Sequence, residues 1–185
     1  LPVMPSTIMI SDLCKKYNRG KAASYTYKIA VGEFDDPANQ RQGLLEIDLA
    51  NGNVAIISNN LASSERFIST LLWSSIIEHT PYEIAHYIID FGTESLRRFL
   101  KFPHVGEVIL QDDPDSVINI ISLIAEELEN RKNMMADYNG SFIYYNQMNE
   151  QKLPLICFII NAYDVLSLKE AGVENPVAGF NNPEY

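Results

Sequence analysis

The chain has 185 residues, of which 46% are apolar, and a net charge of −10 at pH 7. This length suits one globular domain with a sizeable core and disfavours two full domains. The acidic balance disfavours nucleic-acid binding, which depends on Lys and Arg contacting phosphates. No apolar run approaches the ~20 residues of a membrane-spanning helix.

The first part of the chain predicts an entry segment followed by two strands. Two prolines precede a short apolar stretch, so residues 1–20 are expected to form a linker that leads into a helix capped near Ser11 or Asp12. YTYKIAVGEF alternates as a strand does, turn residues follow, and LLEIDL alternates again before the Asn51-Gly52 turn. We expect these strands at the border of the fold.

From residue 53 onward, strand patterns and helix patterns alternate. NVAIIS predicts a buried strand, apolar spacing predicts a helix from Glu65 to about His79, and YEIAHYIIDF predicts the next strand. EVILQ predicts a further strand, residues 116–138 a long amphipathic helix, and LPLICFIIN a fully buried strand. This order predicts an α/β fold with a mostly parallel sheet and helices on both faces.

The pattern weakens after Asn161. Residues 171–185 are rich in Asn, Pro and Gly and are expected to be a flexible tail or a truncated remainder, which places the domain at residues 21–170. A sheet that ends on its most apolar strand leaves an unprotected edge. We therefore expect the fold to be incomplete at its C-terminus.

The turn between the strand at 53–58 and the next helix lies where a nucleotide-binding fold has its phosphate loop. That loop needs G-x-x-x-x-G-K-[ST], because glycines let the backbone wrap the phosphates, lysine neutralises them and the hydroxyl holds magnesium. Here serines replace both glycines and the lysine, and a glutamate replaces the hydroxyl. The predicted degenerate loop consists of Ser58, Asn59, Asn60, Leu61, Ala62, Ser63, Ser64 and Glu65.

Two interpretations of this loop stay open. In the plainer one it is an ordinary helix start, with Ser63 or Ser64 as N-cap and Glu65 as a first-turn anion. In the other it is a phosphate site that still works, although the Glu65 carboxylate lies in the zone where a triphosphate would bind. Weak nucleotide binding is kept as an alternative, because the helix N-terminus at Ser64 offers backbone donors.

The second half of an ATPase site is an acidic pair at the end of a buried strand, one residue for magnesium and one for water. The corresponding strand here ends in Asn161 and Ala162, which supply neither a charge nor a base. We predict no catalytic residue, no metal site, and weak or absent binding of ATP and magnesium. Cys157 is expected to be a buried free thiol, and the DFG at 90–92 to be a chance match to the kinase motif.

Several ordered segments resemble the FtsK/SpoIIIE-type ATPase domains of type VII secretion motors, the EssC/YukB/EccC family. The resemblance covers residues 1–166 and is carried by AVGEFDDPANQRQGLLEIDL, IIDFGTESLRRFLKFPHVGEVILQDD, LIAEELENRKNMM, SFIYYNQM and LPLICFIIN. Because both nucleotide motifs are degenerate, the chain resembles a late domain of the family's tandem array, most of all the third.

This resemblance implies a RecA-like P-loop NTPase fold with three layers. It also implies a hexameric parent protein anchored in the membrane and facing the cytoplasm, neighbouring ATPase domains, and WXG100-type substrates recognised through a C-terminal signal. We expect the domain to act in substrate docking or regulation of export. The alternatives are a DNA translocase, a weak nucleotide-binding domain and a purely structural spacer.

Overall fold

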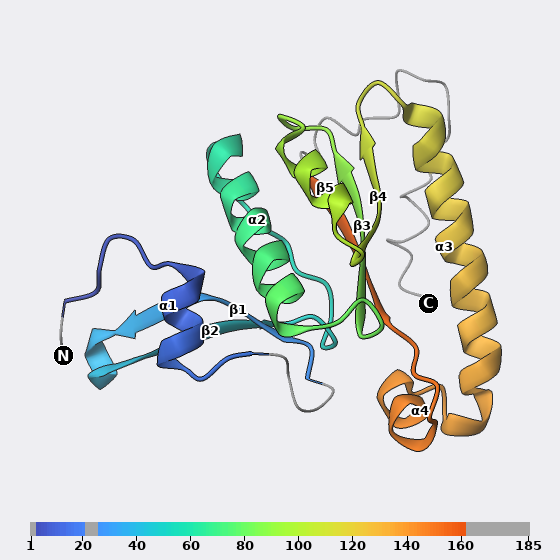
Figure 1. Cartoon of the computed structure of the whole chain (residues 1–185), viewed down its shortest axis with the longest axis horizontal. Helices are drawn as coiled ribbons and strands as arrows, with labels where there is room; N and C mark the ends of the chain where they lie inside the picture. The colour runs from blue at the N-terminus through green and yellow to red at the C-terminus, as the bar shows by residue number, and fades with distance from the viewer. Residues whose placement is uncertain (1–2, 21–25, 162–185) are drawn as a thin grey trace.

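The computed structural model describes residues 3–20 and 26–161 (Figure 1). Helix α1 (Ile10–Lys16) precedes a hairpin of β1 (Lys28–Asp36) and β2 (Arg41–Asp48), joined through the 3-10 turn η1 (Pro37–Asn39). The main body then contains α2 (Leu61–Glu78), β3 (Ile84–Asp90), η2 (Ser95–Lys101), β4 (Val105–Leu110), α3 (Pro114–Met135), η3 (Ala136–Tyr138), α4 (Phe142–Met148) and β5 (Leu155–Asn161). No helix of this described part is long and apolar enough to cross a bilayer.

The main body has the predicted three layers. Its sheet has the order β4-β3-β5, and both pairings are parallel. On one face α2 contributes Ile68 and Leu72 to a core with Ile88 of β3 and Phe99 of η2. On the other face lies α3 (Figure 1), whose apolar side chains pack against β3 and β4. The predicted α/β fold with helices on both faces is confirmed.

The β1–β2 hairpin forms a separate two-stranded antiparallel sheet beside α2, at the border of the molecule as predicted (Figure 1). Its inner residues Tyr27 and Ile29 are buried against Leu71 and Ile84. Helix α2 therefore makes apolar contacts on two sides, with the main sheet and with the hairpin.

A cluster of buried histidines lies near the C-terminus of α2 and the first half of β3. The Nε2 atom of His86 lies 2.9 Å from the Ser75 hydroxyl, and His104 Nε2 lies 2.9 Å from the carbonyl oxygen of His79. His79 Nε2 in turn lies 2.9 Å from the carbonyl oxygen of Thr26, at the start of the hairpin. Burial, together with the nearby His104 and His79, lowers the pKa of His86 to about 3. His86 is therefore neutral in the folded protein at neutral pH.

The predicted buried strand at residues 53–58 is wrong. This segment has no strand pairing, and Val54, Ile56 and Ile57 have exposed fractions of 49%, 37% and 96%. An apolar run becomes a buried strand only when a neighbouring strand pairs with it, and none does so within residues 3–20 and 26–161. Strand β5 is also half-buried instead of fully buried over residues 155–160, since only β3 pairs with it there.

Two predicted helix caps differ from the structure. The N-cap of α1 is Met9, so Ser11 and Asp12 lie inside the first turn, where the Asp12 carboxylate still favours the helix dipole. Helix α2 begins at Leu61, four residues before the predicted start, because the Asn60 side chain accepts a hydrogen bond from the Ser63 amide at 2.8 Å. Neither Ser63 nor Ser64 is the cap.

Candidate functional site

The candidate site lies at the carboxyl end of the sheet, where β3 ends in Asp90 and β5 ends in Asn161. These two residues are partners in the parallel register, so their side chains lie beside each other. Both are buried, with exposed fractions of 0% for Asp90 and 2% for Asn161. In open α/β sheets this end is where ligands bind.

The Asn161 side chain links two carboxylates at this end. Its Nδ2 atom donates to Asp90 Oδ1 at 2.8 Å and to Glu65 Oε1 at 3.2 Å. Asp90 also accepts from the backbone amides of Gly92 and Leu96, at 3.2 and 2.9 Å. An amide at position 161 thus supplies two donors to a pair of buried acids, which an aspartate there could not do.

Glu65 reaches this network from α2 and is tied to the loop after β3. The backbone amide of Thr93 donates to Glu65 Oε1 at 2.8 Å, and its hydroxyl donates to Oε2 at 2.6 Å. The Ser95 hydroxyl donates to the same Oε2 at 3.2 Å. Burial raises the pKa of Glu65, but the hydrogen bonds from Thr93, Asn161 and Ser95 outweigh it and lower the pKa below its usual value. Glu65 is therefore a bound carboxylate.

Gly92 has no side chain, and this allows the Glu65 and Asn161 side chains to lie close to its backbone. A Cβ atom at position 92 would lie 2.5 Å from Glu65 Oε1 and 2.6 Å from Asn161 Nδ2, closer than real contacts allow. Glycine in the DFG sequence therefore permits the approach of Glu65 and Asn161. The structure gives DFG a local role, since Asp90 holds the Gly92 and Leu96 amides and starts the following turn.

The predicted loop residues 58–65 divide into two groups. Ser58, Asn59 and Asn60 form a turn in which the Ser58 hydroxyl donates to the Asn60 carbonyl at 2.9 Å and accepts from the Asn60 amide. The residues from Leu61 onward belong to α2. Glu65 is accordingly the fifth helical residue and is buried, so the prediction of a first-turn anion at the helix end is wrong.

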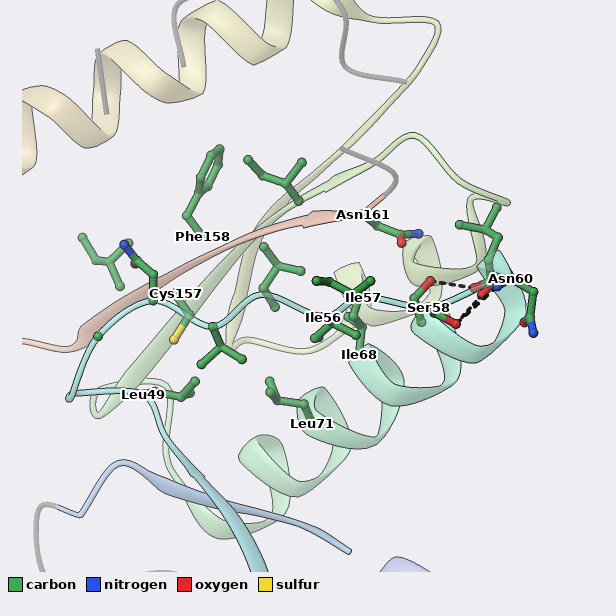
Figure 2. Close-up of a pocket in the computed structure, with 18 of the residues that line it drawn as sticks. Leu49, Ile56, Ile57, Ser58, Asn60, Ile68, Leu71, Cys157, Phe158 and Asn161 are labelled. Carbon is green, nitrogen blue, oxygen red and sulfur yellow. Dashed lines mark hydrogen bonds between the residues drawn. The ribbon is translucent and has the colours of Figure 1, made fainter. Parts of the chain in front are cut away.

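A groove of about 700 Å³ opens between this turn and β5 (Figure 2). It runs from Leu49 past Ile56 and Ile57 to Asn60, with Cys157 and Phe158 on the β5 side. Cys157 faces this groove half-buried, so it is less enclosed than predicted, and burial raises the pKa of its thiol to about 12.

The polar side chains at this end of the sheet are hydrogen-bonded to one another. Asn161 and Glu65, predicted from two separate motifs, are brought into direct contact, while Ala162 lies outside the described residues. No group of three or more His, Cys, Asp and Glu side chains within residues 3–20 and 26–161 is placed to hold a metal.

Sequence reasoning missed Thr93 and Ser95, although polar residues directly after the apolar strand at 84–90 were a usable signal. Their hydroxyls sit three and five residues beyond Asp90 and complete the shell around Glu65.

The chain is similar in sequence to one protein family and to secretion proteins of several bacteria. Residues 65–166 match the model of the FtsK/SpoIIIE family. The chain is 30% identical over 138 residues to the ESX secretion system protein EccC of Geobacillus thermodenitrificans, covering 74% of this chain and 9% of that protein. It is 24% identical over 170 residues to the type VII secretion system protein EssC of Staphylococcus aureus, covering 90% and 12%. The chain therefore spans about a tenth of these relatives.

Solved structures show the same likeness. ATPases 2 and 3 of EssC from Geobacillus thermodenitrificans superpose with a TM-score of 0.73 at 25% identity, over 95% of this chain and 32% of that one. ATPases 2 and 3 of Thermomonospora curvata EccC, solved in complex with a signal sequence peptide, share the fold with a TM-score of 0.70 at 23% identity. That match covers 83% of this chain and 30% of the other. Both likenesses agree with the predicted P-loop NTPase fold.

Proposed function

The chain belongs to the FtsK/SpoIIIE family, and from this premise we propose that it is a module of a type VII secretion motor that does not hydrolyse ATP by itself. The observation that carries the proposal is the contact between Glu65 and Asn161, at 3.2 Å. These residues stand where the magnesium-binding hydroxyl and the magnesium-binding aspartate of an active relative are expected. In this chain the Asn161 amide donates a hydrogen bond to the Glu65 carboxylate.

The chemistry of the region supports this proposal in a second way. A triphosphate carries several negative charges, and catalysis of its transfer depends on cations and positioned donors around them. Glu65 brings a negative charge to the site, and serine at position 64 brings no positive charge to offset it. The donors of Thr93 and Asn161 are already used by the Glu65 carboxylate.

We expect the purified chain to release no phosphate from ATP with magnesium above a heat-denatured control. The loss of the lysine and of the acidic pair removes groups that each supply several kcal/mol, about 3 or more, of transition-state stabilisation. The measurement is a coupled phosphate-release assay, with the heat-denatured chain as the blank. Magnesium-dependent release by the wild-type chain that survives repurification would contradict the proposal.

We further propose that the module docks WXG100-type secreted proteins through their C-terminal signal. It would do so within a hexameric parent protein at the cytoplasmic face of the bacterial membrane, beside the neighbouring ATPase domains. Two observations support docking. The EccC of Thermomonospora curvata was solved with a signal sequence peptide. Helix α4 here leaves Tyr144 and Met148, one helical turn apart, 43% and 62% exposed, which suits contact with an amphipathic helix.

A labelled C-terminal peptide of the cognate secreted protein is expected to bind the chain with a dissociation constant below ~1 mM, or about −4 kcal/mol. Replacing Met148 with lysine should weaken binding severalfold, because it puts a charge into an apolar contact. Met9→Lys is the matched control, since Met9 and Met148 have the same exposed fraction of 62% on different parts of the molecule. No binding at ~1 mM would leave the spacer alternative standing.

The DNA-translocase alternative gains no support from the structure. The chain has two short basic stretches, RGK at residues 19–21 and SLRRFLK at residues 95–101. Arg19, in the first, already makes ion pairs with Glu46 and Glu78 at 3.1 and 2.8 Å. Arg98, in the other, donates to the Ser69 hydroxyl. These cations are therefore partly neutralised or engaged within the fold, and the net charge of −10 opposes a polyanion.

A further inference from the structure

The sequence contains two Asn-Gly pairs, Asn51-Gly52 and Asn139-Gly140. All four residues are exposed. An asparagine in such a pair can react with its own backbone, because the glycine nitrogen attacks the carbonyl carbon of the asparagine side chain. Glycine favours the attack, since it has no Cβ to hinder the approach and its backbone turns freely. The two pairs have the same reacting groups, so their local structures decide how readily each one reacts.

The Asn139-Gly140 pair ends the helical segment formed by α3 and η3, and its reacting nitrogen is hydrogen-bonded. The Gly140 amide donates to the Met135 carbonyl oxygen at 3.0 Å, a bond that closes the end of a helix. Asn139 and Gly140 both have left-handed backbones, with φ of 56° and 67°. The attack at Asn139 requires the Gly140 nitrogen to leave Met135 and turn toward the side chain. The fold therefore opposes the reaction at this pair.

The Asn51-Gly52 pair follows β2, and its reacting groups are not held in this way. Within residues 3–20 and 26–161, neither the Gly52 amide nor the Asn51 side chain has a hydrogen-bond partner. The Asn51 amide makes only a long contact of 3.4 Å with the carbonyl oxygen of Asp48. A Cβ atom at position 52 would meet no atom within 4 Å, so the peptide bond has room to turn. Nothing in this part of the fold has to break before the ring closes.

We propose that Asn51 is a self-modification site, where the folded chain converts asparagine to isoaspartate and aspartate, and that the fold protects Asn139. The Gly52 nitrogen loses its proton and forms a bond to Asn51 Cγ. The bond from Cγ to Nδ2 breaks, and the amide group leaves with that proton as ammonia. Water then opens the succinimide ring at either of its two carbonyl carbons. One water is consumed and one ammonia is released, so the reaction needs no oxidant and no cofactor.

The modification changes the link between β2 and residues 53–58. Both products carry a carboxylate in place of the amide, which makes the net charge of −10 more negative by one unit. Isoaspartate also leads the backbone through its Cβ, which lengthens the link by one methylene group. Gly52 and Asn53, the next two residues, line the groove of Figure 2, where no described lining residue is charged. The inference is independent of the proposed function, since neither ATP nor a docked peptide takes part.

The test incubates the whole folded chain at mildly alkaline pH and follows isoaspartate at each asparagine by tandem mass spectrometry of its digested peptides. Isoaspartate should form at Asn51 about fivefold faster than at Asn139 or more, since fivefold corresponds to about 1 kcal/mol, the net strength of one hydrogen bond. In denaturing urea the two rates should converge. Equal rates in the folded chain, a difference that persists in urea, or aspartate without isoaspartate at position 51 would overturn the proposal.

One pair of variants checks the site by charge. Asn51→Gln keeps an exposed amide, but its longer side chain would have to close a six-membered ring, which forms far more slowly. Anion exchange of the incubated wild-type chain should show a growing, more acidic species, and Asn51→Gln should remove most of it. Asn53→Gln is the matched control, because Asn53 is also exposed but is followed by valine, and it should keep the acidic species. Equal amounts of this species in both variants would refute the assignment to Asn51.

Discussion

Replacing Asn161 with aspartate is expected to lower the free energy of unfolding by about 3 kcal/mol at pH 7, the size found when a buried charge loses its partner. The change keeps the size of the side chain, so it leaves no cavity. It removes the amide that donates to Asp90 at 2.8 Å and to Glu65 at 3.2 Å. It also places a third carboxylate beside Asp90 and Glu65, and all three of these positions are buried.

Urea denaturation of the variant and the wild-type chain measures this difference. Asn59→Asp is the matched control, because Asn59 is exposed and the same chemical change there should alter stability by about 0.5 kcal/mol or less. The difference between Asn161→Asp and wild type should shrink as the pH falls and the carboxylates take up protons. An Asn161→Asp chain as stable as the Asn59→Asp chain would show that the network does not hold the two acids together.

Acidification from pH 7 to pH 5 is expected to lower the free energy of unfolding by about 2 kcal/mol through His86 alone. Its pKa is about 3 in the folded protein, against 6.5 in an unfolded chain, because burial and the nearby His104 and His79 oppose its charge. The stabilising effect of a neutral His86 is complete above about pH 6.5 and is lost progressively as the pH falls below that value, since the unfolded chain then binds a proton that the folded chain excludes.

His86 and the carboxylates change the free energy of unfolding in different pH ranges. Glu65 has a lowered pKa, so its contribution is present above its unfolded value of 4.5 and is lost only at lower pH. A His86→Gln variant keeps a polar group near the Ser75 hydroxyl but cannot take up a proton. Its stability should change little between pH 7 and pH 5, measured by urea titrations at closely spaced pH values. A wild-type curve that is flat over this range would contradict a neutral, buried His86.

The elements that could be predicted from sequence are those with a local signal. Helix α3 has its periodic apolar residues and its cap, Asp113, in adjacent positions, and β3 is a short apolar run between turn residues. The start of α2 was missed because asparagine and serine are both good caps and three such residues stand within five positions. In the structure Asn60 is the cap, because its side chain accepts the hydrogen bond from the Ser63 amide.

The parts that could not be predicted depend on residues far apart in the chain. Glu65 is held by Thr93 and Asn161, which lie 28 and 96 positions away, so nothing near Glu65 predicts a buried, bonded carboxylate. Residues 53–58 have the composition of a strand. Composition does not show, however, whether another strand lies beside them to pair with. The degenerate motifs could be recognised, whereas the direct contact between them could not.

Helix α2 connects the carboxyl end of the main sheet to the region of the β1–β2 hairpin. Glu78 lies thirteen positions after Glu65, a distance of about 20 Å along a helix axis. At one end Glu65 is tied to the loop after β3, and at the other Glu78 is tied to Arg19, whose guanidinium also donates to the backbone of β1 at Lys28. A tilt of α2 as a rigid body that separates Glu65 from Thr93 must also displace Glu78 and change its ion pair with Arg19. Displacement of Glu65 at the carboxyl end of the sheet would thus reach the N-terminal hairpin without unwinding a single turn.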